Sequence, residues 1–294
     1  MSETDDRIDT PLLQQPSIFA PGLFANKTYF ITGGGSGIGL AIAAELRHLG
    51  ANVIIGSRGE EKLRKGAETL EQIEGTGEVM WTVCNIREED SIESAIDAAK
   101  ERFKTIDGLV NNGGGQFPSP AVMMSKKGWN AVIDTNLTGT FFMSQKMLTK
   151  AFSSQGHGNI VNIIAQMWNG FPMMAHTGAA RSGVDNLTKT LAFEWASLGV
   201  RVNAVAPGVI LSSGVENYTP ANREFFFGAT DSIPAGRLGT PREIAAATVF
   251  LLSPAANFIT GTTMRVDGGE PLFGHSAANQ MREMLSLKPT DKYE

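Results

Sequence analysis

Cysteine is almost missing from this sequence, since Cys84 is the only one among 294 residues. No disulfide can form within the chain, which fits a reducing compartment. Apolar runs of the roughly 18 residues that a membrane helix needs are also lacking. The acidic amino terminus is unlike a secretory signal, and the carboxyl terminus is no peroxisomal address of the Ser-Lys-Leu type. We therefore expect a cytoplasmic protein that has no membrane partner.

Positive charge is in deficit as well. The 25 lysines and arginines face 30 aspartates and glutamates, which gives a net charge of −5. This balance argues against nucleic acid as the main partner, but leaves room for a local basic pocket that binds a phosphorylated ligand. No metal site is expected. The hydrophobic fraction of 42% is that of an ordinary globular protein, and a doubly wound α/β sheet of this length is commonly one domain.

From Lys27 onward, short β-rich runs alternate with longer helical stretches. Strands separated by helices indicate βαβ units and a parallel sheet. The runs are apolar throughout rather than alternating, as expected when helices cover both faces of the sheet. The sequence therefore predicts an α/β protein with a Rossmann-type doubly wound parallel sheet. Its expected strands are Thr28–Thr32, Asn52–Ile55, Val79–Cys84, Gly108–Val110, Asn159–Ile164, Arg201–Ala204 and Thr263–Val266.

One domain is expected between an arm and a tail. The amino-terminal arm is polar and has no periodicity, which favours a loose segment or, alternatively, one that packs across a neighbouring subunit. After the sixth strand, an irregular and aromatic-rich segment that includes Tyr218 interrupts the alternation. It would overhang the carboxyl ends of the strands, where ligands bind in such folds, and is expected to be a substrate lid. The expected boundaries are 1–21 for the arm, 22–275 for the domain, about 209–234 for the lid within it, and 276–294 for the tail.

A glycine-rich string follows the first expected strand and precedes an amphipathic helix over Leu40–Leu49. Glycines allow a tight turn and a close approach of the backbone to a pyrophosphate, which rests on the amino terminus of the helix. The position between strand and helix predicts dinucleotide binding, and a glycine-rich turn without a ligand is the alternative. The expected contacts are Gly33, Ser36, Gly37, Ile38 and Gly39.

The end of the second strand indicates which dinucleotide is bound. Enzymes that use NAD usually place a carboxylate about 20 residues past the glycines, but this chain has Ser57 and Arg58 there. A guanidinium can hold a 2′-phosphate with charge-assisted hydrogen bonds. NADPH is therefore the expected cofactor. The alternative is that Arg58 is only a surface charge at a helix start.

Several separated motifs resemble those of the short-chain dehydrogenase/reductase family, and they span nearly everything from Lys27 to Gly269. They are the glycine-rich string after Thr32, Asn111-Asn112-Gly113-Gly114, Asn136 within Thr135–Thr140, Pro207-Gly208 and Asp267-Gly268-Gly269. The resemblance implies a Rossmann fold, a nicotinamide cofactor and a homo-oligomer, usually a tetramer. It also implies cofactor contacts at Asn85, Ile86, Asn112, Gly113, Gly114, Arg181, Pro207, Gly208 and Val209.

The catalytic set of that family is substituted. Its dehydrogenases and ketone reductases use Ser, Tyr and Lys, and the tyrosine protonates an alkoxide on the carbon that receives the hydride. The three positions here hold Ala165, Thr177 and Arg181. A threonine hydroxyl is too weak an acid and too short to replace the phenol. Asp185 and Lys189 repeat the Tyr-Lys spacing two turns later, where surface ion pairing with Arg181 or Lys189 explains Asp185.

Hydride transfer to an α,β-unsaturated thioester does not need that phenol, because negative charge then develops on the thioester oxygen. Hydrogen-bond donors at this oxygen and a later proton at the α-carbon suffice. Strings such as Gly178–Arg181, Ala206–Ile210 and Phe258–Gly261 resemble the peroxisomal trans-2-enoyl-CoA reductases, with the 2,4-dienoyl-CoA reductases as more distant relatives. The resemblance implies NADPH-dependent reduction of a 2-enoyl-CoA.

Five residues are candidates for catalysis. Arg181 would bind the nicotinamide ribose and stabilise the enolate. Gln166, aligned with a catalytic tyrosine of the dienoyl-CoA reductases, would donate to the thioester oxygen, and Asn136 would hold a water. His176 would supply a proton or only pack at a helix start, and Tyr218 would reach the substrate or only cover apolar surface. A 3-oxoacyl or alcohol dehydrogenase with unusual catalytic groups and a catalytically silent NADPH-binding protein are the alternative functions.

Overall fold

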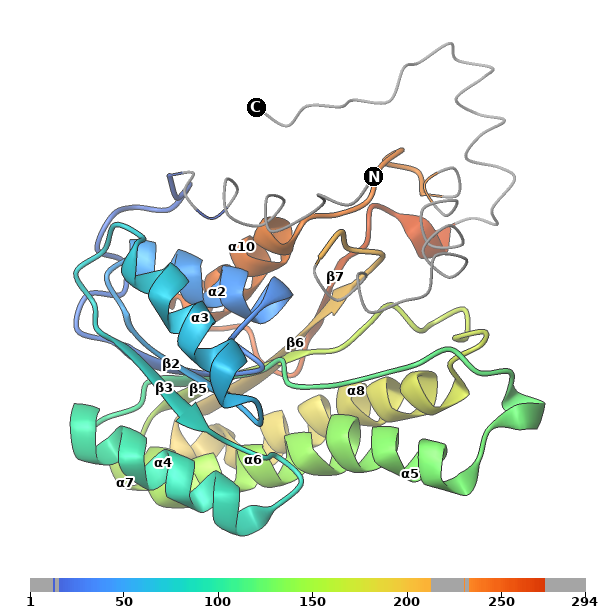
Figure 1. Ribbon diagram of the computed structural model, residues 1–294. Coiled ribbons are helices and arrows are strands. Elements are labelled where there is room, and N and C mark those ends of the chain that lie inside the picture. The colour runs from blue at the N-terminus through green and yellow to red at the C-terminus, as the bar shows by residue number, and fades with distance from the viewer. Residues whose placement is uncertain (1–12, 14–15, 213–229, 231–232, 273–294) are drawn as a thin grey trace.

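The centre of the protein is one sheet of seven parallel strands with helices on both faces (Figure 1). The computed structural model describes residues 13, 16–212, 230 and 233–272. The strand order β3-β2-β1-β4-β5-β6-β7 changes direction between β1 and β4, which confirms the predicted Rossmann-type fold. The strands are β1 (Thr28–Thr32), β2 (Asn52–Ser57), β3 (Val79–Val83), β4 (Gly108–Asn111), β5 (Gly158–Ile163), β6 (Val200–Pro207) and β7 (Thr263–Val266).

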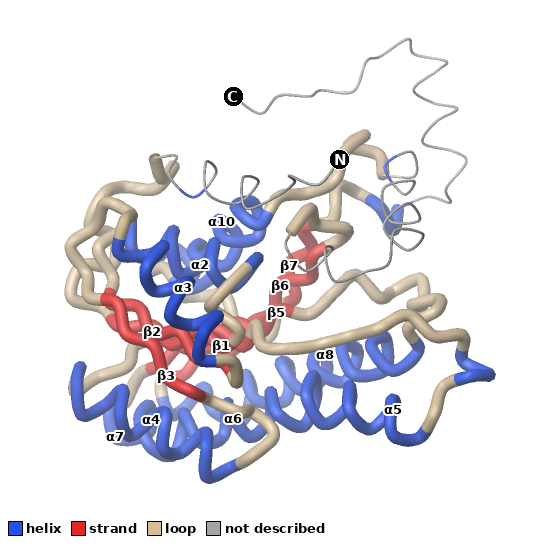
Figure 2. The backbone as a smooth tube through the Cα atoms, viewed as in Figure 1, coloured by secondary structure: helices blue, strands red, loops and turns tan. Residues whose placement is uncertain are grey.

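Two layers of helices cover the sheet (Figure 2). The helices α2, α3 and α10 pack on one face, and α4, α6 and α8 pack on the other. Five-residue π turns at Asp134–Thr138 and Leu148–Phe152 join α5, α6 and α7 into one long run. In the described part of the chain, no helix is long and apolar enough to cross a membrane. The helices are α2 (Gly37–His48), α3 (Glu60–Glu71), α4 (Glu89–Phe103), α5 (Lys126–Ile133), α6 (Gly139–Met147), α7 (Ser153–Gln155), α8 (Ala175–Trp195) and α10 (Pro241–Leu252).

The central strands form the core because they are apolar on both faces. Ile31 of β1 and Val205 of β6 face the layer of α2 and α10, whereas Ile54 of β2 faces the layer of α4 and α6. All three are fully buried, and burial of such a side chain contributes about 1.5–3 kcal/mol. The edge strands β3 and β7 are only partly buried. This packing places the carboxyl ends of all seven strands at one edge of the sheet.

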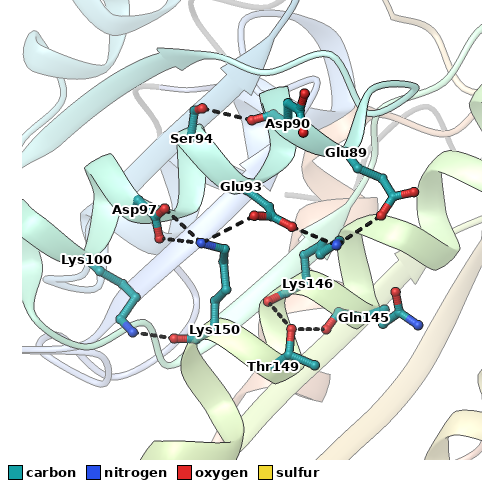
Figure 3. A network of polar contacts seen from close by, with 10 residues as sticks. All are labelled: Glu89, Asp90, Glu93, Ser94, Asp97, Lys100, Gln145, Lys146, Thr149 and Lys150. Atoms are coloured by element: carbon teal, nitrogen blue, oxygen red, sulfur yellow. Dashed lines mark hydrogen bonds and ion pairs between the residues drawn. The ribbon is translucent and has the colours of Figure 1, made fainter.

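An ion-pair network holds α4 against the run of α6 (Figure 3). Nζ of Lys146 lies 2.9 Å from Glu89 and 2.7 Å from Glu93, and Nζ of Lys150 lies 2.8 Å from Asp97. The three carboxylates are four residues apart and therefore share one face of α4. The hydrogen bond from Lys146 lowers the pKa of Glu93, so this stabilisation is present at neutral pH and is lost as the pH falls through that pKa. Solvent screening keeps the contribution modest.

The expectation of a loose amino-terminal arm is wrong for its described part. Leu13 is 7% exposed, and its carbonyl oxygen accepts a hydrogen bond from Nε2 of His48 at 2.9 Å. Ser17 donates to the buried carboxylate of Glu45 at 2.5 Å. The segment is held on α2 of its own chain because its few apolar and polar contacts match the outer face of that helix. Most of the predicted lid and all of the predicted tail lie outside the described residues.

Candidate active site

The turn from β1 into α2 is packed too tightly for side chains. Gly33 has a φ of +66°. A Cβ on Gly34 would lie 2.5 Å from Cγ2 of Ile55, and a Cβ on Gly39 would lie 2.4 Å from the carbonyl oxygen of Gly33. Glycine avoids both the left-handed strain and these collisions. The tight turn that these glycines allow is the one expected at a dinucleotide site.

The amino terminus of α2 carries no side-chain cap. Ser36, the residue before the helix, makes no capping hydrogen bond, and the first turn contains no acidic residue. Unsatisfied amides and the positive end of the helix dipole attract an anion to such a terminus. Gly37, Ile38 and Gly39 form this turn. The structure thus brings the predicted pyrophosphate contacts together at one anion-binding end.

The neighbouring strand locks the glycine turn in place. Nδ2 of Asn112, just after β4, donates to the carbonyl oxygens of Thr32 at 3.1 Å and Gly33 at 3.2 Å. Oγ1 of Thr32 accepts the N–H groups of Asn112 at 3.1 Å and Gly113 at 2.8 Å. The ends of β1 and β4 are therefore joined where the strand order changes direction, which is where ligands bind in open α/β sheets. Sequence reasoning did not include Thr32 among the site residues, although its motif contains it.

The residues that follow β2 leave a cation available. Ser57 is half-buried at the end of the strand, and Arg58 is exposed. Within the part of the chain that the structure describes, the Arg58 guanidinium forms no hydrogen bond or ion pair. No carboxylate competes for it, so these two residues fit a phosphorylated ribose better than a ribose with a free 2′-hydroxyl.

Asn85 and Ile86, two predicted cofactor contacts after β3, have different structural roles. Ile86 is 9% exposed, and its Cδ1 lies 3.3 Å from the place of a Cβ on Gly113. It thus forms an apolar wall beside the switch point. Asn85 donates through Nδ2 to Glu88 at 2.6 Å and accepts the N–H of Arg87 at 3.3 Å. The Asn85 amide therefore shapes its own loop, a contact that the motif alone did not predict.

The ends of β5 and β6 lie side by side on the other half of the site. The N–H of Gln166 donates to the carbonyl oxygen of Pro207 at 2.8 Å, and the N–H of Gly208 donates to that of Val266 at 3.0 Å. The carbonyl oxygen of Val209 is bonded to the N–H of residue 239. The half-buried Gln166 side chain forms no hydrogen bond with any described residue. Its amide is therefore available as a donor.

Arg181 is a desolvated cation without a counter-ion. Its Nη2 lies 2.6 Å from the place that a Cβ on Gly114 would take, so a side chain at this position would displace the guanidinium. Among the described residues, none forms a hydrogen bond or ion pair with Arg181. Burial lowers the pKa of Arg181 to about 10. The group still carries its charge at neutral pH, and this charge is available to an anionic ligand.

Asn136 contacts the backbone on both sides of its amide. It is fully buried in the π turn after α5. Its Oδ1 accepts the N–H of Gly115 at 2.9 Å, and its Nδ2 donates to the carbonyl oxygen of the same residue at 2.9 Å. One donor and one acceptor site of the amide are thus paired with Gly115, and the residue fixes the loop that passes Arg181. That Asn136 also holds a water stays a prediction.

The position of the family tyrosine is filled by a buried hydroxyl. Thr177 is fully buried, and its Oγ1 lies 3.2 Å from Nδ1 of His176. Ala165, at the serine position, follows β5 and carries no polar group. Tyr218 lies outside the described residues. No described residue thus places a phenol at the position of the missing tyrosine.

Related proteins are known. A family model described as Enoyl-(Acyl carrier protein) reductase matches residues 33–270. A peroxisomal 2,4-dienoyl-CoA reductase of Danio rerio, described as (3E)-enoyl-CoA-producing, is 36% identical over 286 residues, which cover 96% of this chain and 93% of that protein. This chain belongs to the short-chain dehydrogenase/reductase family. It is therefore an oxidoreductase that binds a nicotinamide cofactor.

Two further members of the family are similar over most of their length. A probable 2,4-dienoyl-CoA reductase of Bacillus subtilis is 37% identical over 83% of this chain and 96% of its own. The solved structure of a citronellol catabolism dehydrogenase from Pseudomonas aeruginosa is 44% identical, covers 90% of this chain and 100% of its own, and superposes with a TM-score of 0.76. Dienoyl-CoA reductases, which we expected to be more distant relatives than the trans-2-enoyl-CoA reductases, are similar over most of this chain.

Asp185 is oriented away from the site of this family. It forms an ion pair with Lys189 and accepts a hydrogen bond from Oγ1 of Thr263 in β7 at 2.6 Å. Its side chain is only 15% exposed. The predicted pairing with Lys189 is confirmed, but the pair is not a simple surface pair, because Asp185 also ties α8 to the sheet. No ion pair between Asp185 and Arg181 forms in the described structure.

Sequence reasoning missed Asp267 as a polar group of the site. Its Oδ1 accepts the N–H of Gly269 at 3.0 Å. Its Oδ2 is buried and has no hydrogen-bond partner among the described residues. The residue follows β7, and a Cβ on Gly208 would lie 2.8 Å from its Cα. The Asp-Gly-Gly motif contained this signal but was taken only as the end of the sheet.

We expect the substitution Asp185→Asn to leave turnover within a few-fold of the wild type and to lower the free energy of unfolding by about 1–2 kcal/mol, because it weakens a largely buried hydrogen bond and an ion pair. Thermal unfolding and steady-state kinetics measure the two effects. Thr263→Val removes the same contact from the other side and should not add fully to Asp185→Asn in the double variant. A hundredfold loss of turnover in Asp185→Asn would contradict the orientation of α8.

Proposed function

We propose that this oxidoreductase reduces an α,β-unsaturated acyl-CoA thioester with NADPH. The proposal rests on one observation, that the site lacks the phenol of a ketone reductase but contains a cation. The phenol that ketone reduction needs is replaced by Thr177, while the positive charge of Arg181 beside Gly114 has no counter-ion among the described residues. A site with a cation and without a strong proton donor suits a reaction in which negative charge appears away from the attacked carbon.

The electron flow of this reaction needs stabilisation at one oxygen. Bound NADPH supplies the hydride. When the β-carbon of the thioester accepts it, the electron pair of the double bond moves onto the thioester oxygen and an enolate forms. Arg181 stabilises this oxygen, and the Gln166 amide is the second proposed donor. Each preorganised donor lowers the barrier by roughly 3–4 kcal/mol.

The α-carbon must then receive a proton. The buried Oδ2 of Asp267 has no protein partner in the described chain, so it can accept a hydrogen bond from a water and orient that water. Asn136 acts indirectly, by holding Gly115 and with it the loop that borders Arg181. Tyr218 stays a proposed donor from the lid.

The relatives favour a second substrate form. If hydride adds to the δ-carbon of a 2,4-dienoyl thioester, the negative charge reaches the same thioester oxygen through the conjugated system. Protonation at the α-carbon then leaves a 3-enoyl product, which is the product stated in the description of the Danio rerio protein. The residues proposed above serve both additions, because the charge ends on the same atom.

The cofactor half supports NADPH over NADH. The Arg58 guanidinium is exposed next to Ser57 and pairs with no residue of the described chain, whereas a carboxylate at this place would repel a 2′-phosphate. The pyrophosphate would rest on the amino terminus of α2, beside Gly33 and Gly37. The cytoplasmic location, the homotetramer and the absence of a metal stay predictions.

Three substrates separate the candidate functions. With NADPH deuterated at the transferred position, crotonyl-CoA should give butyryl-CoA that carries deuterium at C3, because the β-carbon receives the hydride. A 2,4-hexadienoyl thioester should give a 3-hexenoyl product with deuterium at C5. Mass spectrometry of the products checks both. A labelled 3-hydroxyacyl-CoA from acetoacetyl-CoA would overturn the proposal, and no NADPH oxidation with any of the three would indicate a catalytically silent protein.

Arg58→Ala should raise the Kd of NADPH about 10- to 100-fold and leave the Kd of NADH unchanged, because charge-assisted hydrogen bonds contribute about 1.5–3 kcal/mol. Titration of both cofactors by protein fluorescence measures this. Arg64→Ala is the matched control, since Arg64 is exposed on nearby α3 and already paired with Glu68. Equal affinities of the wild type for both cofactors would refute the assignment.

Arg181→Met should abolish most turnover and raise the KM of NADPH, yet leave the unfolding temperature of the free protein unchanged or higher. Burial lowers the pKa of Arg181 to about 10, so the charged form is penalised in the folded state at every pH below that value. Arg181→Lys should keep most activity at pH 7. As the pH is raised, this variant should lose activity earlier than the wild type, because a lysine is deprotonated at a lower pH than an arginine. Lys189→Met, on the same helix, is the control for turnover only, because Lys189 pairs with Asp185. A destabilised but fully active Met variant would contradict the assigned role.

A further inference from the structure

The imidazole of His176 is a buried polar group that the reaction described above does not use. His176 is the second residue of α8 and is fully buried. Its ring packs edge-to-face against Phe117, with the ring centroids 4.6 Å apart. Phe117 is 40% exposed and lies against Gly128 of α5, where a Cβ would be 2.8 Å from its Cζ. The imidazole is thus packed against the loop after β4.

The hydrogen bonds of the ring define its tautomer. Nδ1 accepts the backbone N–H of Thr177 at 2.7 Å, and Oγ1 of Thr177 lies 3.2 Å from the same nitrogen. A backbone N–H can only donate, so this hydrogen bond requires an Nδ1 without a proton, and it competes with the Met174 carbonyl, which favours a protonated ring. A neutral imidazole then has its proton on Nε2. His176 is thus an Nε2–H donor.

That donor is unused within the protein. Nε2 is buried and has no hydrogen-bond partner among the residues that the structure describes. Burial also lowers the pKa of His176, against the opposing effect of the Met174 carbonyl. The ring therefore stays neutral at neutral pH and cannot serve as the strong acid that an imidazolium would be. Buried groups of this kind are rare in native proteins, and a ligand commonly completes them.

We infer that the Nε2–H group of His176 donates a hydrogen bond to the thioester carbonyl oxygen of the acyl substrate. The inference rests on the proposed function. His176 is next to Thr177, and Thr177 occupies the position of the family tyrosine. The His176 ring contacts Phe117 in the loop after β4. Three residues earlier, the same loop borders Arg181 at Gly114. His176, a neutral donor, and Arg181, a cation, both belong to α8 and both contact the loop after β4. His176 stabilises the enolate oxygen by a hydrogen bond and keeps its proton.

Two variants test the donor. His176→Phe keeps the ring and its contact with Phe117 but removes the N–H, and should lower kcat with crotonyl-CoA about 100-fold without changing the Kd of NADPH. His176→Gln places an amide N–H near Nε2 and should restore at least a tenth of the wild-type kcat. His157→Gln, at an exposed histidine, is the control and should leave kcat unchanged. Wild-type kcat in His176→Phe would overturn the inference.

Nitrogen NMR tests the same donor without turnover. The ¹⁵N spectrum of the wild type, assigned by replacing each of the other three histidines of the sequence in turn (His48→Gln, His157→Gln and His275→Gln), should show His176 as the neutral Nε2–H tautomer. Its Nε2–H resonance should shift when butyryl-CoA is added to the complex with NADP⁺, and not with NADP⁺ alone. This shift without reduction of any unsaturated acyl-CoA would refute the proposed function and keep the donor. The other tautomer, or no shift with butyryl-CoA, would overturn the inference even if His176→Phe failed to fold.

Discussion

The site depends on one close approach, between the glycine turn after β1 and the chain that leaves β4. A single methyl group on Gly39 would overlap both the carbonyl oxygen of Gly33 and Nδ2 of Asn112. Because the Asn112 amide is bonded to two carbonyl oxygens of this turn, the chain after it is directed toward Gly114 and the start of α8. The anion-binding end of α2 and the loop that borders the catalytic helix are therefore fixed by the same contact.

A network of buried hydrogen bonds fixes the position of α8 along the sheet. Nδ2 of Asn111 in β4 donates to Oδ1 of Asn162 in β5 at 2.9 Å, and Nδ2 of Asn162 donates to Oγ1 of Thr188 in α8 at 2.9 Å. All three side chains are at most 3% exposed. Fully satisfied networks of this kind specify one arrangement of the elements that they join. Thr188 lies two turns beyond Arg181, so the network also fixes where the guanidinium meets Gly114.

The sequence predicted those parts of the protein that local patterns encode. Apolar runs separated by helices indicate the sheet, and the string from Gly33 to Gly39 indicates the turn that the structure contains, because strand, turn and helix start are contiguous in the chain. Asn136 and Asp185 were assigned incompletely, since their partners Gly115 and Thr263 are brought near only by the fold. The described part of the amino-terminal arm escaped prediction for the same reason, because its partners lie on α2 and α10.

The unsatisfied groups of the fold show what kind of ligand completes it. In the described chain, only two buried side-chain atoms lack a hydrogen-bond partner, Nε2 of His176 and Oδ2 of Asp267. The first is a donor and the second an acceptor, and Arg181 adds an uncompensated positive charge. An enolate oxygen needs donors and positive charge, whereas a water that delivers a proton to carbon needs an acceptor to orient it. Because a buried polar group is costly until it is paired, binding of such a ligand removes the cost that folding leaves at these positions, and the hydrogen bonds to the oxygen strengthen as its negative charge develops.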